Sequence, residues 1–195
     1  HAHGFIRRLP HGYDTVLGEN GKAIYSELGE MMFTQFGVTG PVILSASAHI
    51  RGFKVSDLSL SIDLKPALDE QTLDARLLSD FSKNANRNAE NALGALLPSK
   101  MILPMLSYVG IEKTKKINLI TREERRALLR ALKGFTVPLS GFRPIEEAIV
   151  TSGGVAVKEV SPKTMMSKLC EGLFFAGEML DVDAYTGGYN LQIAF

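Results

Sequence analysis

The chain has 195 residues, 45% of them hydrophobic and 22% charged, a composition typical of a globular protein with one or two domains. With 22 Lys and Arg against 21 Asp and Glu, the formal net charge of +1 gives no overall attraction to nucleic acid or to a membrane surface, and we expect neither as a partner. Cys170 is the single cysteine, which excludes an intramolecular disulfide and a multi-cysteine metal site and favours a reducing, cytoplasmic location.

The two ends of the chain indicate a fragment of a longer protein. The chain begins without an initiator Met and stops at Ile193-Ala194-Phe195, inside an apolar pattern of helical spacing that no Gly or Pro ends. The most apolar run, residues 41–50, is about half the roughly 20 residues that a membrane-spanning helix needs, so no span is expected. His1 and His3 have no carboxylate or cysteine beside them, and no metal site is predicted.

The segment from Gly4 to Gly21 resembles the stretch just before the signature motif of ABC transporter ATPases. The Leu-Ser-Gly-Gly-Gln motif that should follow is replaced by Lys22-Ala23-Ile24-Tyr25, and both Walker motifs are missing, so no ATPase function is implied. We therefore interpret residues 1–21 as an extraneous or ABC-ATPase-like segment, joined to the rest near Asn20-Gly21 by gene fusion or an assembly error. The alternative is a chance match in which Asn20-Gly21 is a hairpin turn.

A strand and a long helix are predicted next. Within residues 53–65, Leu and Ile alternate with polar residues from position 58 onward, which predicts a half-buried strand. Beyond Pro66 the period changes, and an apolar residue recurs at every fourth position from Leu73 to Leu93. This spacing predicts one long amphipathic helix, with Asp69 as its N-cap.

Two further helices follow. Residues 99–109 predict a helix in which Pro104 causes a kink or a break. Thr121 with Glu124 three residues later predicts a capping box at the start of the next helix, which Gly134 ends.

Short runs of strand-forming residues return at 135–139, 148–150 and 155–160, with Gly153-Gly154 as the turn between the last two. They indicate that a sheet interrupted by the helices resumes here. We therefore expect a β-rich domain at 22–65 and 135–170, and a helical subdomain at 66–134 within it.

The end of the chain carries the pattern most typical of a ligand site. Leu173–Ala176 predicts a short buried strand that leads into Gly177-Glu178, then a polar loop, and then a helix that begins after Gly187-Gly188. A helix that starts at two glycines presents unpaired N–H groups and the positive end of its dipole, which suit a flat ring that gains negative charge on reduction. The simpler interpretation of each residue alone is a tight turn with solvated or helix-capping Asp residues.

Three segments together resemble one family. Residues 177–192, Gly-Glu-Met-Leu-Asp-Val-Asp-Ala-Tyr-Thr-Gly-Gly-Tyr-Asn-Leu-Gln, are similar to the C-terminal flavin motif of the BaiN-like bacterial NAD(P)/FAD-dependent oxidoreductases. Gly29 to Pro41, with Phe-Thr-Gln-Phe-Gly-Val-Thr-Gly-Pro at its end, and Ala148 to Val155, with Thr-Ser-Gly-Gly, follow in the family's order. The resemblance covers about residues 21–195.

The resemblance implies a fold of the α+β class: a fragment of a two-part, α/β FAD-binding flavoprotein. The chain would hold a β-barrel-like insertion with its helical subdomain, and then, at 171–195, the C-terminal strand, turn and helix of the FAD domain. Glu178 and Asp181 would face the ribityl-phosphate region of FAD. The complete set of implied cofactor-binding residues is Gly177, Glu178, Asp181, Thr186, Gly187, Gly188, Tyr189, Asn190, Leu191, Gln192, Thr151, Gly153 and Gly154.

The implied activity is that of an FAD-dependent oxidoreductase that takes electrons from NAD(P)H and acts on a small organic substrate, with no catalytic acid or base identified. Ala184 stands where the family pattern has Gly, and the Gly-x-Gly-x-x-Gly turn that binds the FAD pyrophosphate is absent, so we expect it upstream. The chain alone should bind FAD weakly and be inactive. The alternative is a non-catalytic binding or oligomerisation module with a relic flavin site.

Overall fold

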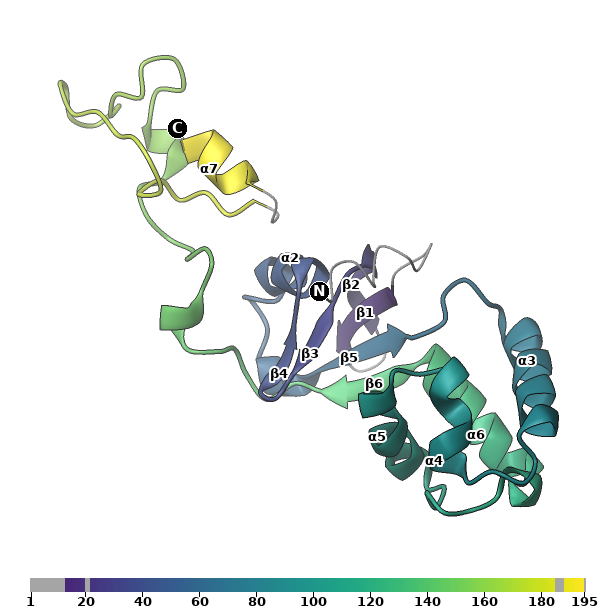
Figure 1. The fold of residues 1–195 in the computed structure, drawn as a ribbon. Helices are drawn as coiled ribbons and strands as arrows, with labels where there is room; N and C mark the ends of the chain where they lie inside the picture. Colours follow the sequence, from purple (N-terminus) through teal and green to yellow (C-terminus); the bar gives the residue numbers. More distant parts are fainter. Residues whose placement is uncertain (1–12, 20–21, 185–187, 195) are drawn as a thin grey trace. The chain divides into compact units, whose positions relative to one another are not determined.

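The computed structural model describes residues 13–19, 22–184 and 188–194. The chain divides into two compact units, each formed by two stretches of sequence. Figure 1 shows the helices and strands of the described residues. The first unit comprises His1–Gly29 and Ser59–Pro138, and the second comprises Glu30–Leu58 and Leu139–Phe195. No helix of the described residues is both long and apolar enough to cross a membrane.

The first unit contains a four-stranded sheet in the order β2-β1-β5-β6. Its strands are β1 (Tyr13–Glu19), β2 (Lys22–Gly29), β5 (Leu58–Asp63) and β6 (Phe135–Pro138). The predicted alternation is confirmed, because Leu58, Leu60 and Ile62 are buried while the residues between them are only half-buried. β5 pairs antiparallel with β6, so strands on either side of the helical segment meet in one sheet.

The start of the described chain is part of this sheet. β1 pairs antiparallel with β2 along its whole length, from Tyr13 opposite Gly29 to Glu19 opposite Lys22, and β1 also neighbours β5. The proposed junction at Asn20-Gly21 lies outside the described residues. Because the flanking strands pair up to Glu19 and Lys22, they have the arrangement that a two-residue hairpin connection requires.

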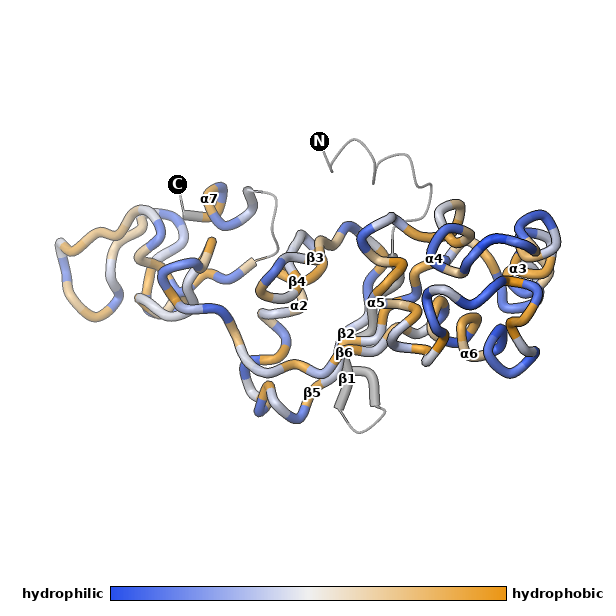
Figure 2. Tube along the Cα trace, turned by 60° about the horizontal axis from the view of Figure 1, so that its bottom comes forward, coloured by the Kyte–Doolittle hydropathy of each residue, from blue (hydrophilic) through white to orange (hydrophobic). Residues whose placement is uncertain are grey.

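Four α-helices follow β5 in the first unit: α3 (Glu70–Lys83), α4 (Ala89–Ala92), α5 (Ser99–Val109) and α6 (Arg122–Lys133). Short 3-10 turns lie at Leu93–Ala95 and Ile117–Leu119. Figure 2 shows apolar and polar residues alternating along α3 and α6, as an amphipathic helix requires. The helical core consists of side chains with almost no exposure, namely Leu73, Leu77, Leu93, Met105, Leu106, Leu128 and Leu132.

The prediction of one long helix to Leu93 is wrong, because α3 ends at Lys83. Asn84 ends it: its side-chain amide donates to the Asp80 carbonyl at 2.8 Å, which competes with helical bonding. After the turn, the backbone N–H of Ile117 donates to the Arg87 carbonyl at 3.0 Å. The four-residue spacing continues past the break because Ala89 and Leu93 are also buried.

The bounds of the other two helices are confirmed, but the break considered at Pro104 does not occur. α5 is continuous through Pro104 and ends at Val109, before Gly110, which has a left-handed φ of 73°. α6 has the predicted capping box, in which the Thr121 hydroxyl accepts from the Glu124 N–H and the Glu124 carboxylate accepts from the Thr121 N–H.

The second unit begins with a two-stranded hairpin, β3 (Met32–Thr34) and β4 (Gly37–Thr39), followed by α2 (Pro41–His49). Its remaining regular elements are 3-10 turns at Val55–Asp57, Ile145–Glu147 and Val157–Glu159 and the final helix α7 (Tyr189–Ala194). Gly40 joins β4 to α2 with φ 110°, and a Cβ there would lie 2.9 Å from the Glu30 carbonyl oxygen and the Met31 Cα. Only glycine fits this crossing of two backbones.

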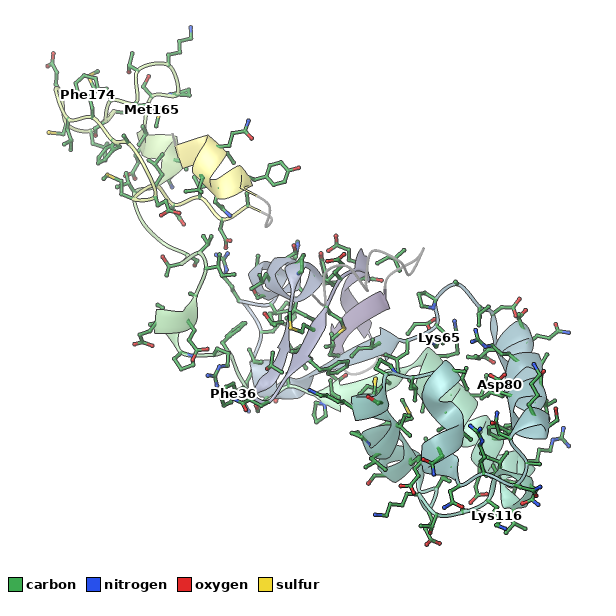
Figure 3. All side chains as sticks on the ribbon, in the orientation of Figure 1. Phe36, Lys65, Asp80, Lys116, Met165 and Phe174 are labelled. Atoms are coloured by element: carbon green, nitrogen blue, oxygen red, sulfur yellow. The ribbon has the colours of Figure 1, made fainter. Side chains whose placement is uncertain are left out.

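Three predicted strands in this unit are wrong. Residues 148–150 form no strand, and 155–160 and 173–176 contribute only isolated bridges, such as Val155 with Leu180 and Met166 with Phe174. Several apolar side chains of these runs are exposed, Ile149 by 70% and Phe174 by 60% of their surface, although Val160 is buried. Phe174 is labelled in Figure 3. No described strand pairs with these runs in a continuous ladder, so they do not become strands. The described strands form sheets of four and two strands and no closed barrel, so the barrel-like part of the expected fold is not seen.

Candidate functional site

Two loops of the second unit, far apart in sequence, are held side by side by three hydrogen bonds. The backbone N–H of Val155 donates to the Met179 carbonyl at 2.8 Å, and the N–H of Asp181 donates to the Val155 carbonyl at 2.9 Å. The Asp181 carboxylate accepts from the Gly153 N–H at 3.0 Å. The structure therefore brings together two of the segments from which the sequence predicted the site.

The contact between these loops depends on Gly154. Its φ is 134°, and a Cβ built on it would lie 2.5 Å from the Met179 carbonyl oxygen. Gly153 also has a positive φ, 105°, but a Cβ there would meet nothing within 4 Å. The two glycines thus differ: both need an unusual backbone conformation, and only Gly154 needs the absence of a side chain for packing.

Asn190 fastens the polar loop to α7. Asn190 is only 8% exposed. Its side-chain oxygen accepts from the Ala184 N–H at 2.7 Å, and its side-chain nitrogen donates to the Ala184 carbonyl at 3.0 Å. Both bonds are to the backbone, so the Ala that replaces the expected Gly at this position does not disturb them. Asn190 therefore acts as a positioning residue for the loop.

An ion pair between Arg51 and Asp183 also anchors this loop. The Asp183 side chain is 21% exposed, and Arg51 lies just after α2. Arg51 could not be identified from the sequence, because a single Arg outside any motif carries no signal for a partner that lies so far along the chain.

A small pocket of about 120 Å³ lies where the loops meet. Its lining includes three of the predicted cofactor-binding residues, Thr151, Glu178 and Asn190, beside five apolar residues, Ala148, Ile149, Val150, Leu180 and Val182. Thr151 and Glu178 are exposed, and among the described residues neither side chain has a hydrogen-bond partner. Because ligand pockets usually measure about 300–1,000 Å³, these residues can supply only one wall of a cofactor site.

The other predicted site residues occupy the ends of the same loop. Gly177 is buried with φ 87°, and Gly188 has φ 93° directly before α7. The side chains of Tyr189, Leu191 and Gln192 are exposed on α7. Thr186 and Gly187 lie outside the described residues. α7 has six residues, so the dipole at its start is weaker than that of a full-length helix.

Arg143 orders the approach to the pocket. Its guanidinium lies 4.5 Å from the centre of the Phe36 ring, at the tip of the β3–β4 hairpin (Figure 3), and donates to the Glu147 carboxylate at 2.6 and 3.0 Å. These bonds raise the pKa of Arg143 and lower the pKa of Glu147. The pair fixes the turn that precedes Ala148, a role that the sequence alone did not indicate.

Comparison with known proteins identifies a family. Residues 11–150 match the family described as "HI0933-like protein barrel and H2TH domain". The match begins before β1, and alignments with three curated relatives cover 90–93% of the chain. The resemblance of residues 4–21 to ABC transporter ATPases therefore finds no support, since most of that segment belongs to the family's own sequence.

Three curated relatives are similar at about the same level. The chain is 30% identical over 182 residues to the ribosomal RNA dihydrouridine synthase of Escherichia coli, and 30% identical over 181 residues to that of Haemophilus influenzae. It is 28% identical over 178 residues to the 3-dehydro-bile acid delta(4,6)-reductase of Clostridium scindens.

The chain spans 42–44% of the length of these relatives. Of the three motif segments, 29–41 lies wholly inside the matched region, 148–155 overlaps its end by three residues, and 177–192 follows it. The family match covers well over half of the chain, and the protein therefore belongs to the HI0933-like family.

Proposed function

We propose that the protein is part of an FAD-dependent oxidoreductase that reduces a carbon–carbon double bond conjugated to a carbonyl group, with electrons supplied by NAD(P)H. The observation that carries the proposal is the fastening of Gly153–Val155 to Met179–Asp181 around a pocket lined by Thr151 and Glu178. These are residues of the motifs that resemble flavin enzymes, and they come together from distant parts of the chain.

The names of the relatives point to one type of reaction. Dihydrouridine is uridine whose C5–C6 double bond, conjugated to the C4 carbonyl, has been reduced. The bile-acid reductase is named for double bonds at positions 4 and 6 of a compound that carries a 3-oxo group. Reduction of either kind of double bond would add a hydride to a carbon β or δ to the carbonyl and a proton to a carbon nearer the carbonyl, which are steps that a reduced flavin supports.

The described residues fit one side of such a cofactor. Glu178, exposed and without a hydrogen-bond partner among the described residues, would accept from the ribityl hydroxyls. Gly153 and Gly188 have positive φ values and a Cβ on either would meet nothing, so the backbone beside them is open to a close approach by a flat ring. When bound, FAD would supply the hydride transfer, and the chain would supply position and electrostatics.

Asp181 and Asn190 would act differently from Glu178. Their side chains are already engaged with the Gly153 N–H and with the Ala184 backbone. We assign both to holding the two loops in register, so that the Glu178 carboxylate and the Thr151 hydroxyl stay on the same side of the pocket.

The test uses the full-length protein expressed from its gene. We expect the purified protein to retain FAD. In the absence of oxygen, NADH or NADPH should bleach the flavin absorbance, and a cyclic enone should restore it, with one double bond reduced per flavin. Protein that binds FAD and is reduced, but is never reoxidised by an enone, would contradict the substrate class. The 195-residue chain alone should lose FAD on gel filtration.

A second candidate, a non-catalytic binding module, is favoured by the exposed apolar side chains of the second unit, such as Leu169, 76% exposed, and Ile149, 70% exposed. Gly187→Val separates the two. In the full-length protein it should remove flavin and leave the melting temperature within a few degrees if the site is used, whereas a relic site predicts an effect on stability alone. Gly52→Val, at an open position, is the control.

A further inference from the structure

The net charge of +1 conceals an uneven distribution. Residues 66–134 carry twelve Lys and Arg but only eight Asp and Glu, so this part of the chain is positive and the remainder is negative. Three of the acids are neutralised in ion pairs: Asp74 with Arg125, Asp80 with Arg76, and Glu124 with Lys115. The basic side chains left without an ion-pair partner in this fully described segment are exposed, namely Lys83, Arg87, Lys100, Lys113, Lys116, Arg122, Arg126 and Arg130.

Three of these arginines form a line on α6. Arg122, Arg126 and Arg130 are spaced four residues apart, so they lie on one face of the helix about 6 Å apart along its axis. The opposite face is buried through Leu128 and Leu132. Glu123 is the one exposed acidic residue of α6. We call the line of Arg122, Arg126 and Arg130 the arginine face.

More basic residues gather on the loop that leads to α6. The Ala89 N–H donates to the Lys115 carbonyl at 2.9 Å, and Asn88 forms a bridge with Lys116, so Arg87 and Lys116 project from adjacent backbone segments. Figure 3 places Lys116 at the end of the helices away from the sheet. The salt bridge of Lys115 to Glu124, at 2.7 Å, ties this loop to the first turn of α6.

An apolar pocket of about 540 Å³ lies between α3, this loop and the start of α6. Leu78, Phe81, Ile117 and Ile120 contribute its apolar wall, and Arg122 stands in its lining. Arg125 also lines it, held by two hydrogen bonds to Asp74 at 2.9 and 3.2 Å. An aromatic ring and fixed guanidinium groups beside exposed cations are the combination with which proteins hold unpaired bases and phosphates.

We propose that this surface, the arginine face with Arg87, Lys116 and the pocket beside Phe81, binds single-stranded RNA. The cations complement the phosphates, and the pocket accommodates an unpaired base, which a purely anionic lipid surface or an acidic protein would not use. The inference deepens the proposed function, since a bound RNA would present a uracil base whose conjugated double bond is the group reduced. It differs from the expectation, drawn from net charge alone, that no nucleic acid binds, and the experiment below tests the two against each other.

The experiment measures RNA binding without flavin, so its failure is separate from failure of the proposed function. Fluorescence anisotropy of a labelled 20-nucleotide uridine-rich RNA is recorded with the 195-residue chain over a series of salt concentrations. The test variant is Arg122→Ala/Arg126→Ala/Arg130→Ala. The matched control, Lys54→Ala/Lys158→Ala/Lys163→Ala, removes the same charge from exposed positions in the second unit.

We expect the arginine variant to bind at least tenfold more weakly. The slope of the logarithm of the binding constant against the logarithm of the salt concentration should become less steep by about 2, at roughly 0.7 for each lost phosphate contact with a single strand. The control should stay within twofold, and a duplex of the same sequence should bind less tightly. Arg126→Gln, in case the triple variant does not fold, should lower the slope by about 0.7. Equal weakening by the control, equal binding of anionic vesicles, or no binding by the unmodified chain would overturn the proposal.

Discussion

The carboxylate of Asp181 accepts a hydrogen bond from the backbone N–H of Gly153, 28 positions earlier in the chain, at 3.0 Å. This bond joins the loop that carries Thr151 to the loop that carries Glu178. Without it, the backbone contacts of Val155 with Met179 and Asp181 would be the remaining described hydrogen bonds between the two loops. The geometry of the candidate site therefore depends on the Asp181 side chain, which holds the two loops in position.

Asp181→Ala should loosen the loop around Gly153. Removing a charged acceptor costs about 1.5–3 kcal/mol in favourable cases, and less here because Asp181 is exposed. We expect faster hydrogen exchange of the Gly153 and Val155 amides and a small fall in overall stability. Asp181→Asn keeps an acceptor oxygen and is the matched control. Unchanged exchange in the alanine variant would contradict the assignment.

Gly154→Ala should destabilise the second unit by about 1–3 kcal/mol, because the new methyl group would meet the Met179 carbonyl at 2.5 Å in a backbone conformation that L-residues avoid. Gly153→Ala has the backbone cost without the clash, and Gly52→Ala has neither. Urea unfolding should rank the variants Gly154, Gly153 and Gly52 from most to least destabilised. Equal effects of Gly154→Ala and Gly153→Ala would show that the contact with Met179 is not tight.

Thr121→Ala removes the hydroxyl that accepts from the Glu124 N–H in the capping box, and it should lower the free energy of unfolding by about 0.5–2 kcal/mol. The effect should appear in the helical signal of the first unit, where α6 contributes Leu128 and Leu132 to the core. Ser99→Ala, at the exposed start of α5, is the control, because no side-chain cap bond exists there. Thermal unfolding followed by circular dichroism compares the two, and a loss no larger than that of the control would argue against the cap.

Acid should weaken the first unit through Glu124. The hydrogen bond from Lys115, followed by that from the Thr121 N–H, lowers the pKa of Glu124 below its ordinary value of 4.5. Since the folded pKa is depressed, the stabilisation is complete above the ordinary pKa and is lost as the pH falls through the folded one. Urea midpoints measured from about pH 7 to about pH 3 should fall less steeply for Glu124→Gln, and parallel curves would contradict the link.

The features predicted from sequence are those with a local physical cause. The alternation that buries Leu60 and Ile62 and the capping box at Thr121 are set by neighbouring residues, and both are confirmed. The run 173–176 looked like a buried strand because its residues are apolar, but a strand also needs a partner that local sequence does not contain. The end of α3 at Lys83 was missed because the buried periodicity continues across the turn.

The sequence pointed to part of the candidate site for a similar reason. Family motifs identified Thr151, Glu178 and Asn190, which line one pocket, although they did not reveal that Asn190 is bonded to Ala184. Arg51 and Arg143 have partners that only the folded chain brings near. Charge added over the whole sequence likewise hid the exposed arginines of α6, whose alignment depends on the helix being formed and its other face being buried.

The most direct test of the central claim is the dissociation constant of FAD for the full-length protein and its Glu178→Ala variant, measured by flavin fluorescence after the cofactor has been removed. Glu171→Ala, an exposed acid seven positions earlier, is the control. Loss of hydrogen bonds to a charged acceptor, about 1.5–3 kcal/mol, predicts binding weakened at least tenfold by Glu178→Ala and changed by less than twofold by Glu171→Ala. Equal dissociation constants for the two variants would show that Glu178 and its pocket do not hold the cofactor.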